Sequence, residues 1–236
     1  MHFTRRRIIL LIFLLSGIAG LVYEVVWARQ LVLVFGNTTQ AISAILTGFF
    51  AGMAIGSVIG GRLADRVRSP LRLYGVLELL LVGLVLLTPF TFVALREVYR
   101  GAFESLETSP QLLAIVRFAL SILALAPATI MMGATLPALS RHLVRDHREL
   151  GTEFGSLYTV NTLGGVAGTL LAGFVFIEIF GLSQTLEFGA LCSATAGVSA
   201  LLLSRWWPEP GVIRPFRPGK GGQPGEAAAP RPIESK

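Results

Sequence analysis

Residues 41–66 read AISAILTGFFAGMAIGSVIGGRLADR, with no charged side chain before Arg62. A helix needs about 20 mostly apolar residues to cross the hydrocarbon core of a bilayer. Glycine recurs at every fourth position, which places a stripe of glycines along one helical face. Because a face without side chains lets a second helix come close, the stretch predicts a tightly packed transmembrane helix. The glycines of this stripe are Gly48, Gly52, Gly56 and Gly60.

Apolar runs of comparable length lie on both sides of this stretch. They are residues 8–35, 71–95, 112–136, 154–180 and 185–203. Only 14% of the residues are charged and 53% are hydrophobic, whereas soluble domains carry about 25% charged residues. We therefore expect an all-α fold, an integral membrane bundle of about six transmembrane helices in residues 1–208. The Pro-, Gly- and Ala-rich residues 209–236 are expected to form a disordered cytoplasmic tail.

Arginine predicts the orientation. It is concentrated in the loops of one side of the predicted bundle: Arg5, Arg6, Arg7, Arg62, Arg66, Arg68, Arg72, Arg141, Arg145, Arg148 and Arg205. The other side has fewer arginines, mixed with glutamates. Lysine and arginine accumulate on the cytoplasmic side of membrane proteins. Both termini are therefore expected on the cytoplasmic side of a bacterial inner membrane. The net charge of +6 is attributed to this distribution of arginine in the loops rather than to nucleic-acid binding.

A looser glycine stripe occurs in the predicted fifth span. Gly164 and Gly168 are four residues apart, and Ala172 extends the row. Such stripes are typical of tight helix packing. Helices of this kind also slide or rock against each other in transporters, and the two interpretations are compatible.

Ionisable residues inside predicted spans are candidates for function because they are costly in lipid. Glu24 and Arg117 fall toward the outer side, as do Glu178 and Glu187 near the last turn. In one interpretation Arg117 neutralises a glutamate and the other acids reach interfacial water. Glu78 lies nearer the arginine-rich side, where it could pair with the arginines around Asp65.

The alternative interpretation is a binding site for a small cation. Tyr23 and Trp27 flank Glu24 in the first span, and aromatic faces together with carboxylates suit ammonium groups. Asn161 in the fifth span could add polar contacts or join two helices by hydrogen bonds. We therefore expect Tyr23, Glu24, Trp27, Arg117 and Asn161 at polar positions of the bundle interior.

Motifs of soluble enzymes are missing from the sequence. There is no phosphate-binding glycine loop, no serine–histidine–acid grouping and no metal-ligand spacing around His2, His142 or His147. The single cysteine, Cys192, lies in an apolar run and suits a packing role. No cofactor, no metal and no nucleic-acid partner are expected.

The loop Gly61-Arg62-Leu63-Ala64-Asp65-Arg66 is similar to the cytoplasmic signature between the second and third helices of major facilitator transporters. There, the acidic residue and the basic cluster form ion pairs that hold one conformational state. The resemblance implies this role for Gly61, Asp65 and Arg66. The alternative is an ordinary basic cytoplasmic loop.

A longer resemblance covers residues 10–205. The chain resembles the membrane region of bacterial fused spermidine-synthase-like proteins, in which a bundle like half of a major facilitator precedes a cytosolic aminopropyltransferase domain. The residues that carry it are 13–29, 35–39, 52–66, 132–137 and 157–164. The glycine-rich loop and acidic motifs of that domain are not in this sequence, so catalytic activity is not expected.

Two functions follow from this resemblance. The first is a transporter-type half-bundle, acting as a homodimer in the lipid bilayer on polyamines or another small cationic solute. The second is a membrane anchor or scaffold for a separately encoded cytosolic aminopropyltransferase, without transport. A downstream reading frame for such an enzyme would favour the second.

Overall fold

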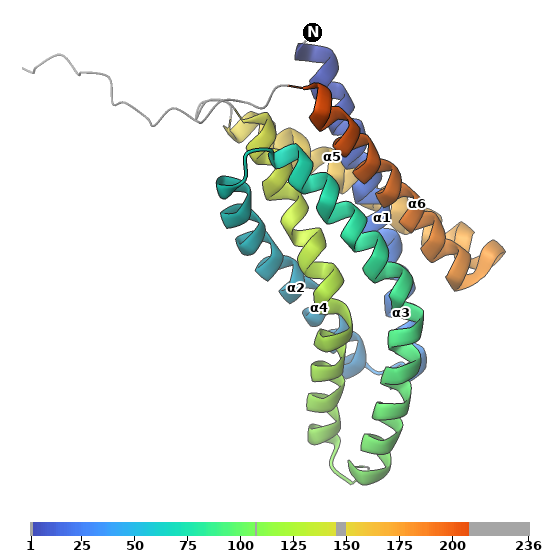
Figure 1. Ribbon diagram of the computed structural model, residues 1–236. Coiled ribbons are helices and arrows are strands. Elements are labelled where there is room, and N and C mark those ends of the chain that lie inside the picture. Colours follow the sequence, from blue (N-terminus) through green and yellow to red (C-terminus); the bar gives the residue numbers. More distant parts are fainter. Residues whose placement is uncertain (1, 107, 145–149, 208–236) are drawn as a thin grey trace, which may run out of the picture.

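The computed structural model describes residues 2–106, 108–144 and 150–207. Within these residues the fold is helical throughout, without a strand (Figure 1). The elements are α1 (His2–Phe35), α2 (Thr39–Arg66), α3 (Pro70–Leu106), α4 (Pro110–Leu143), α5 (Leu150–Leu171), the short π-helix η1 (Ala172–Phe176) and α6 (Ile177–Trp206). The expected tail at 209–236 lies outside the described residues.

Local signals in the sequence explain where these helices begin and end. Gly36 follows α1 with a φ of 86°, a left-handed conformation that glycine adopts without steric cost. Thr38 caps α2 by accepting a hydrogen bond from the Ala41 amide at 3.2 Å. Pro70 and Pro110 occupy the first positions of α3 and α4, where a missing amide proton costs nothing.

The described residues contain five helical segments long and apolar enough to cross a membrane. They are Thr4–Phe35, Thr39–Arg66, Pro70–Leu106, Pro110–Leu143 and Gly151–Trp206. The bundle also exposes large apolar side chains along its length, such as Phe50, Phe90 and Phe174. A soluble monomer rarely exposes so much contiguous apolar surface, whereas lipid accommodates it. The prediction of an all-α bundle with membrane-spanning helices is therefore confirmed.

Helix α3 (Pro70–Leu106) is longer than the predicted third span, residues 71–95. The apolar run that predicts this span ends at residue 95, but α3 continues through the more polar stretch that follows it, to Leu106. No proline interrupts this stretch before Pro110, so nothing stops the helix. With 37 residues, α3 measures about 55 Å at 1.5 Å per residue. The tips of α3 and α4 consequently project beyond the other helices (Figure 1).

Packing divides the bundle into two groups of three helices. In the first group α4 packs against α2 and α3, and in the second α1 packs against α5 and α6. The two groups meet mainly through α3 and α6. Figure 1 shows α2, α4 and α3 side by side, with α6 and α1 beside α3.

The glycine stripe of α2 faces α4. A Cβ added to Gly60 would lie 2.5 Å from the Cα of Ala134, and one added to Gly52 would overlap the side chain of Thr129. At Gly56 it would meet the backbone of Ile130, while Gly48 has only ordinary contacts with α4. The α2 and α4 backbones therefore approach more closely than any side chain on this stripe would allow.

The second stripe faces α1. A Cβ on Gly164 would meet the backbone at Leu14, and one on Gly168 would meet the backbone at Ile18. From the other side, Gly17 of α1 leaves room only for the backbone of Asn161. The α1–α5 contact thus uses the same device as the α2–α4 contact.

Candidate functional site

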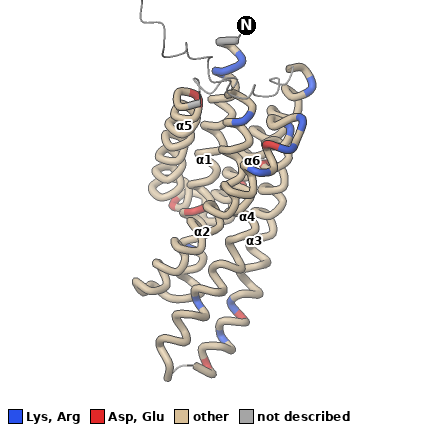
Figure 2. Tube along the Cα trace, turned by 90° about the vertical axis from the view of Figure 1, so that its left-hand side faces the viewer, with Lys and Arg blue, Asp and Glu red and all other residues tan. Residues whose placement is uncertain are grey.

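Charged residues gather at the two ends of the bundle. Figure 2 shows the basic residues, all of them arginines in the part of the chain that the structure describes, concentrated near the N-terminus, and a second group of mixed charge toward the tips of α3 and α4. We call the first region the arginine-rich end; among the described residues it includes Arg6, Arg62, Arg66, Arg141 and Arg205. The end at the tips of α3 and α4 is called the opposite end.

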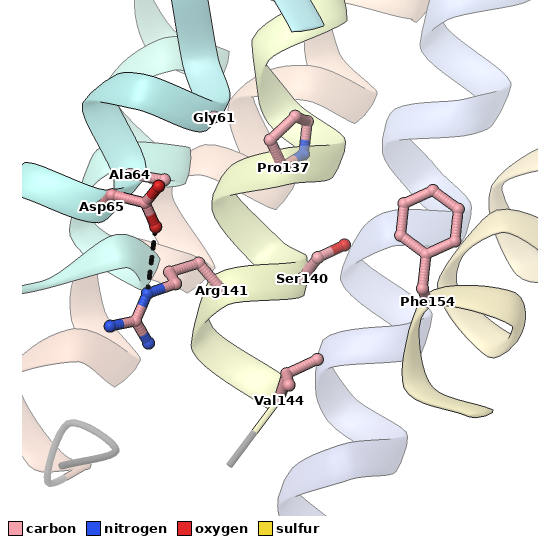
Figure 3. A pocket seen from close by; sticks show the side chains of 8 residues that line it. All are labelled: Gly61, Ala64, Asp65, Pro137, Ser140, Arg141, Val144 and Phe154. Atoms are coloured by element: carbon pink, nitrogen blue, oxygen red, sulfur yellow. Dashed lines mark ion pairs between the residues drawn. The ribbon is translucent and has the colours of Figure 1, made fainter. Parts of the chain in front are cut away.

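An ion pair joins α2 to α4 at the arginine-rich end. Arg141 lies 3.4 Å from Asp65, measured from Nε to Oδ1, and Figure 3 shows the two side chains meeting at the rim of a pocket. Asp65 is well exposed and Arg141 is mostly covered. The loop acid singled out in the sequence therefore has a basic partner, although that partner is on α4 rather than in its own loop.

The pocket beside this pair has a volume of about 240 Å³. Figure 3 shows that α2, α4 and α5 supply its lining. The lining residues are Gly61, Ala64, Asp65, Pro137, Ser140, Arg141, Val144 and Phe154. Gly61 belongs to the predicted loop motif and lines the pocket, but Arg66 does not.

A second ion pair joins α1 to α5 at the same end. Arg6 Nε donates to both carboxylate oxygens of Glu153 at 2.9 Å, and Arg6 Nη2 donates to Ser156 Oγ at 2.7 Å. Both partners are partly covered. The two close helix pairs, α1–α5 and α2–α4, are thus each closed by one ion pair at the arginine-rich end.

Arg117 lies near the opposite end, where it contacts an aromatic side chain. Its Nε donates to the Tyr99 hydroxyl at 2.8 Å, and its guanidinium carbon lies 5.7 Å from the centre of the Tyr99 ring. None of the ion pairs found among the described residues involves Arg117. The interpretation in which Arg117 neutralises a glutamate is therefore not supported by this geometry.

A pocket of about 440 Å³ opens beside Arg117. Arg96 and Arg100 of α3 also line it, together with Phe35 at the end of α1. Arg100 is paired with Glu97 at 3.0 Å. Since three guanidinium groups line this pocket, its field disfavours a cationic ligand.

Tyr23 and Trp27 are fully buried in the bundle. Their rings stack at a centroid distance of 5.5 Å, and Trp27 Nε1 donates to Thr88 Oγ1 on α3 at 3.2 Å. Tyr23 also limits the approach of α6, because a Cβ on Gly189 would lie 2.7 Å from its ring. These two aromatic residues therefore pack α1 against α3 and α6.

The five residues predicted to share a polar interior do not meet in one place. Glu24 and Asn161 are both half-buried, but Asn161 lies at the α1–α5 contact. Arg117 is hydrogen-bonded to Tyr99 near the opposite end. The structure brings together only the Tyr23–Trp27 pair from this set.

A polar cluster that was not predicted from the sequence lies between α1, α3 and α6. Its centre is Glu78, which is completely buried and accepts a hydrogen bond from the Ser16 hydroxyl. The Glu78 carboxyl also interacts electrostatically with Tyr74 and with Ser193 of α6. We call these residues, with Tyr23, the Glu78 cluster; it replaces the expected pairing of Glu78 with the arginines around Asp65.

A signal for this cluster was present in the sequence. Leu71, Tyr74, Leu81 and Val85 are the buried stripe of α3, and Glu78 occupies the same face at helical spacing. A glutamate within such a stripe is expected to face the interior rather than a loop. The positions of Ser16 and Ser193 carried no comparable signal.

Comparison of the chain with protein-family models, with curated proteins and with solved structures gave no match.

Proposed function

We propose that the chain is a transporter-type membrane protein, built as six spans and acting as a homodimer. The observation that carries the proposal is an internal relationship in the packing. If α1 is exchanged with α4, α2 with α5, and α3 with α6, the contact α1–α5 becomes α4–α2 and α1–α6 becomes α4–α3. The α3–α6 contact is exchanged with itself.

The relationship extends to individual residues. The glycine stripe of α2 against α4 corresponds to that of α5 against α1. At the α3–α6 contact the two helices meet glycine to glycine. A Cβ on Gly75 would lie 2.9 Å from the Gly197 carbonyl oxygen, and one on Gly197 would lie 3.1 Å from the Gly75 carbonyl oxygen. Helices three apart in an alternating bundle run in opposite directions, so the repeat is inverted.

Inverted repeats of three helices are the construction principle of several transporter folds. Alternating access then results from rocking one repeat against the other. In this chain the α3–α6 contact is the principal joint between the two groups of helices. The repeat therefore supports a transporter-type bundle more directly than it supports a static anchor.

The six-span count depends on the last helical segment. Gly151–Trp206 has 56 residues, far more than the roughly 20 that one crossing requires. Gly181 lies within it at φ 78° and ψ −179°, outside the helical region. In Figure 1 the chain continues from α5 into the start of α6, then reverses and returns toward the arginine-rich end. Two crossings that meet at Gly181 account for this segment.

Arginine distribution supports the proposed orientation. With six crossings, the N-terminus and the end of α6 lie on the arginine-rich side, which would be the cytoplasmic side of a bacterial inner membrane. Six spans are half of the usual facilitator complement. For this reason a second copy is proposed to complete the enclosed path.

Cysteine labelling would test the topology. In a Cys192→Ala background, single cysteines at Thr38, Thr108 and Ser183 should react in intact cells with a membrane-impermeant maleimide. A cysteine at Thr152 should react only after the cells are opened. A protected Ser183→Cys, in a variant whose Thr38→Cys reports normally, would contradict the six-span arrangement.

Uptake into proteoliposomes tests the function. Putrescine and spermidine are the first solutes to measure, because the resemblance points to polyamines. Uptake is expected to fall in Glu24→Gln, whereas Glu97→Gln is the matched control for an exposed carboxylate. Arg96, Arg100 and Arg117 disfavour a cation in the pocket at the opposite end. Arg117→Ala tests this pocket: a change in uptake would place the solute there rather than at Glu24. No uptake of any solute by reconstituted, dimeric protein would overturn the proposal.

The anchor function rests on the resemblance alone. Co-purification from detergent with a separately encoded aminopropyltransferase, combined with no transport activity, would establish it instead.

A further inference from the structure

The carboxyl of Glu78 is buried without a basic partner. Its exposed fraction is 0%, and none of the ion pairs found among the described residues includes it. Oε2 of Glu78 has no hydrogen-bond partner within the part of the chain that the structure describes. A bare carboxylate in such a place is strongly unfavourable because burial strips it of water without a compensating charge.

The groups around this carboxyl are neutral hydroxyls. Ser16 donates to Oε1, and the hydroxyls of Tyr23, Tyr74 and Ser193 are buried without hydrogen-bond partners among the described residues. The side chains of Tyr74, Ser193 and Tyr23 lie close enough to the Glu78 carboxyl to influence it electrostatically. A protonated carboxyl adds a donor to this cluster, whereas an ionised carboxyl can only accept.

Depth also isolates the cluster from both membrane surfaces. Ser16 is about 14 Å from Arg7 along α1, and Ser193 is about 18 Å from Arg205 along α6, at 1.5 Å per residue. The hydrocarbon core is about 30 Å thick. Along α3 itself Glu78 is about 9 Å from Arg72, an exposed residue of the arginine-rich end. Glu78 therefore lies inside the hydrocarbon core, in its arginine-rich half, in the proposed topology.

Charges on the neighbouring helices lie elsewhere. The titratable groups that interact with Glu78 are the two tyrosines of the cluster, and Cys192 lies beside Tyr23. On α4, Arg117 is bound to Tyr99 and Arg141 to Asp65, while His142 is in the last turn. On α6, Glu187 is exposed and Arg205 is in the last turn. On α1, Glu24 is half-buried, and on α2, Asp65 and Arg66 are at the end of the helix.

We propose that Glu78 is a proton-binding site, protonated at neutral pH while α1, α3 and α6 are closed around it. The ligand is a proton rather than a metal cation because the cluster offers one carboxyl and several hydroxyls, without a second acid. Tyr74 precedes Glu78 by one turn of α3, and Tyr23 is two turns beyond Ser16 on α1. Hydroxyls consequently flank the carboxyl toward both faces of the membrane.

Release of the proton is coupled to the joint between the two repeats. The Cβ of Glu78 would lie 3.0 Å from a Cβ placed on Gly197, so the close α3–α6 contact covers the carboxyl. An ionised Glu78 needs water, and water enters only if α3 and α6 separate. Proton occupancy therefore favours the closed α3–α6 contact and proton loss favours its opening.

Infrared difference spectroscopy tests this site without a transport assay, so its failure is separate from failure of the proposed function. The protein is reconstituted in nanodiscs, and the carbonyl stretch of protonated carboxyl groups is recorded at neutral pH. Wild type minus Glu78→Gln is expected to show one protonated-carboxyl band. Labelling the wild type with ¹³C-glutamate should shift that band, and Glu97→Gln should leave it unchanged.

Ser16→Ala gives a second, milder test that retains the carboxyl. Loss of the hydrogen bond to Oε1 is expected to shift the Glu78 band to higher frequency without removing it. If no ¹³C-sensitive protonated-carboxyl band is present in wild type at neutral pH, the proposal is overturned. It is also overturned if sodium, but not potassium, abolishes the band at constant pH, because the ligand would then be a metal cation.

Discussion

Arg6 and Glu153 hold the arginine-rich ends of α1 and α5 together through two hydrogen bonds of 2.9 Å from one guanidinium nitrogen. The pair closes a helix contact whose backbones are already brought close by Gly17, Gly164 and Gly168. Because both side chains are partly exposed, water and salt weaken their attraction. The pair therefore orients two helices more than it supplies stability.

We predict that Arg6→Ala and Glu153→Gln each destabilise the protein by about 1 kcal/mol or less, the usual range for a partly exposed ion pair. A double-mutant cycle on thermal unfolding in detergent measures their coupling. Raising the salt concentration should reduce it. Glu97→Gln, in the exposed pair with Arg100, should have a smaller effect, and equal effects of the two pairs would contradict this assignment.

A larger effect is expected from Gly56. A Cβ there would overlap the backbone of Ile130 on α4, so Gly56→Ala must force α2 and α4 apart, at a cost of about 1–3 kcal/mol. Gly83→Ala is the matched control, since nothing lies within 4 Å of a Cβ at that helical position. We expect Gly83→Ala to be neutral or stabilising. Equal unfolding midpoints for the two variants would refute the tight α2–α4 contact.

Gly181 provides a conformational test. At φ 78° and ψ −179°, the backbone is in a region that is essentially restricted to glycine, and an alanine there would cost about 1–3 kcal/mol. Gly173→Ala is its control, because that glycine lies in helical backbone with open space around its Cβ position. Gly181→Ala should lower the unfolding temperature more than Gly173→Ala does. A reversed order would mean that the chain does not turn at Gly181.

Much of this fold could be predicted from periodicity. The apolar runs and the Gly48–Gly60 stripe depend on spacing along one helix, which a sequence displays directly. The candidate site was harder to predict from the sequence, because it depends on which helix faces pack against each other. Arg117 and Glu24 were grouped by depth alone, yet Arg117 is on Tyr99, a residue of α3 that depth did not single out. Ser16 and Ser193 became notable only once α1 and α6 were packed around Glu78.

The pairing of Asp65 with Arg141 leads to a prediction about conformation. The pair bridges α2 and α4 beside the pocket at the arginine-rich end, so its loss should favour states in which that pocket opens. Asp65 is highly exposed, which limits the pair to about 1 kcal/mol. That energy corresponds to a change of about fivefold or less in the population of the open state.

Maleimide labelling of a cysteine at Ser140, a half-buried lining residue whose hydroxyl oxygen is buried, measures this population in a Cys192→Ala background. Asp65→Asn and Arg141→Gln should each accelerate labelling about two- to fivefold, in line with the energy of one exposed pair. The charge-swapped double variant Asp65→Arg with Arg141→Asp should restore the slow rate, because it recreates the attraction with reversed polarity. If the swapped protein labels as fast as the single variants, the ion pair does not control the opening. A rate in Asp65→Asn equal to that of the parent would lead to the same conclusion, since that change removes the charge while preserving the size of the side chain.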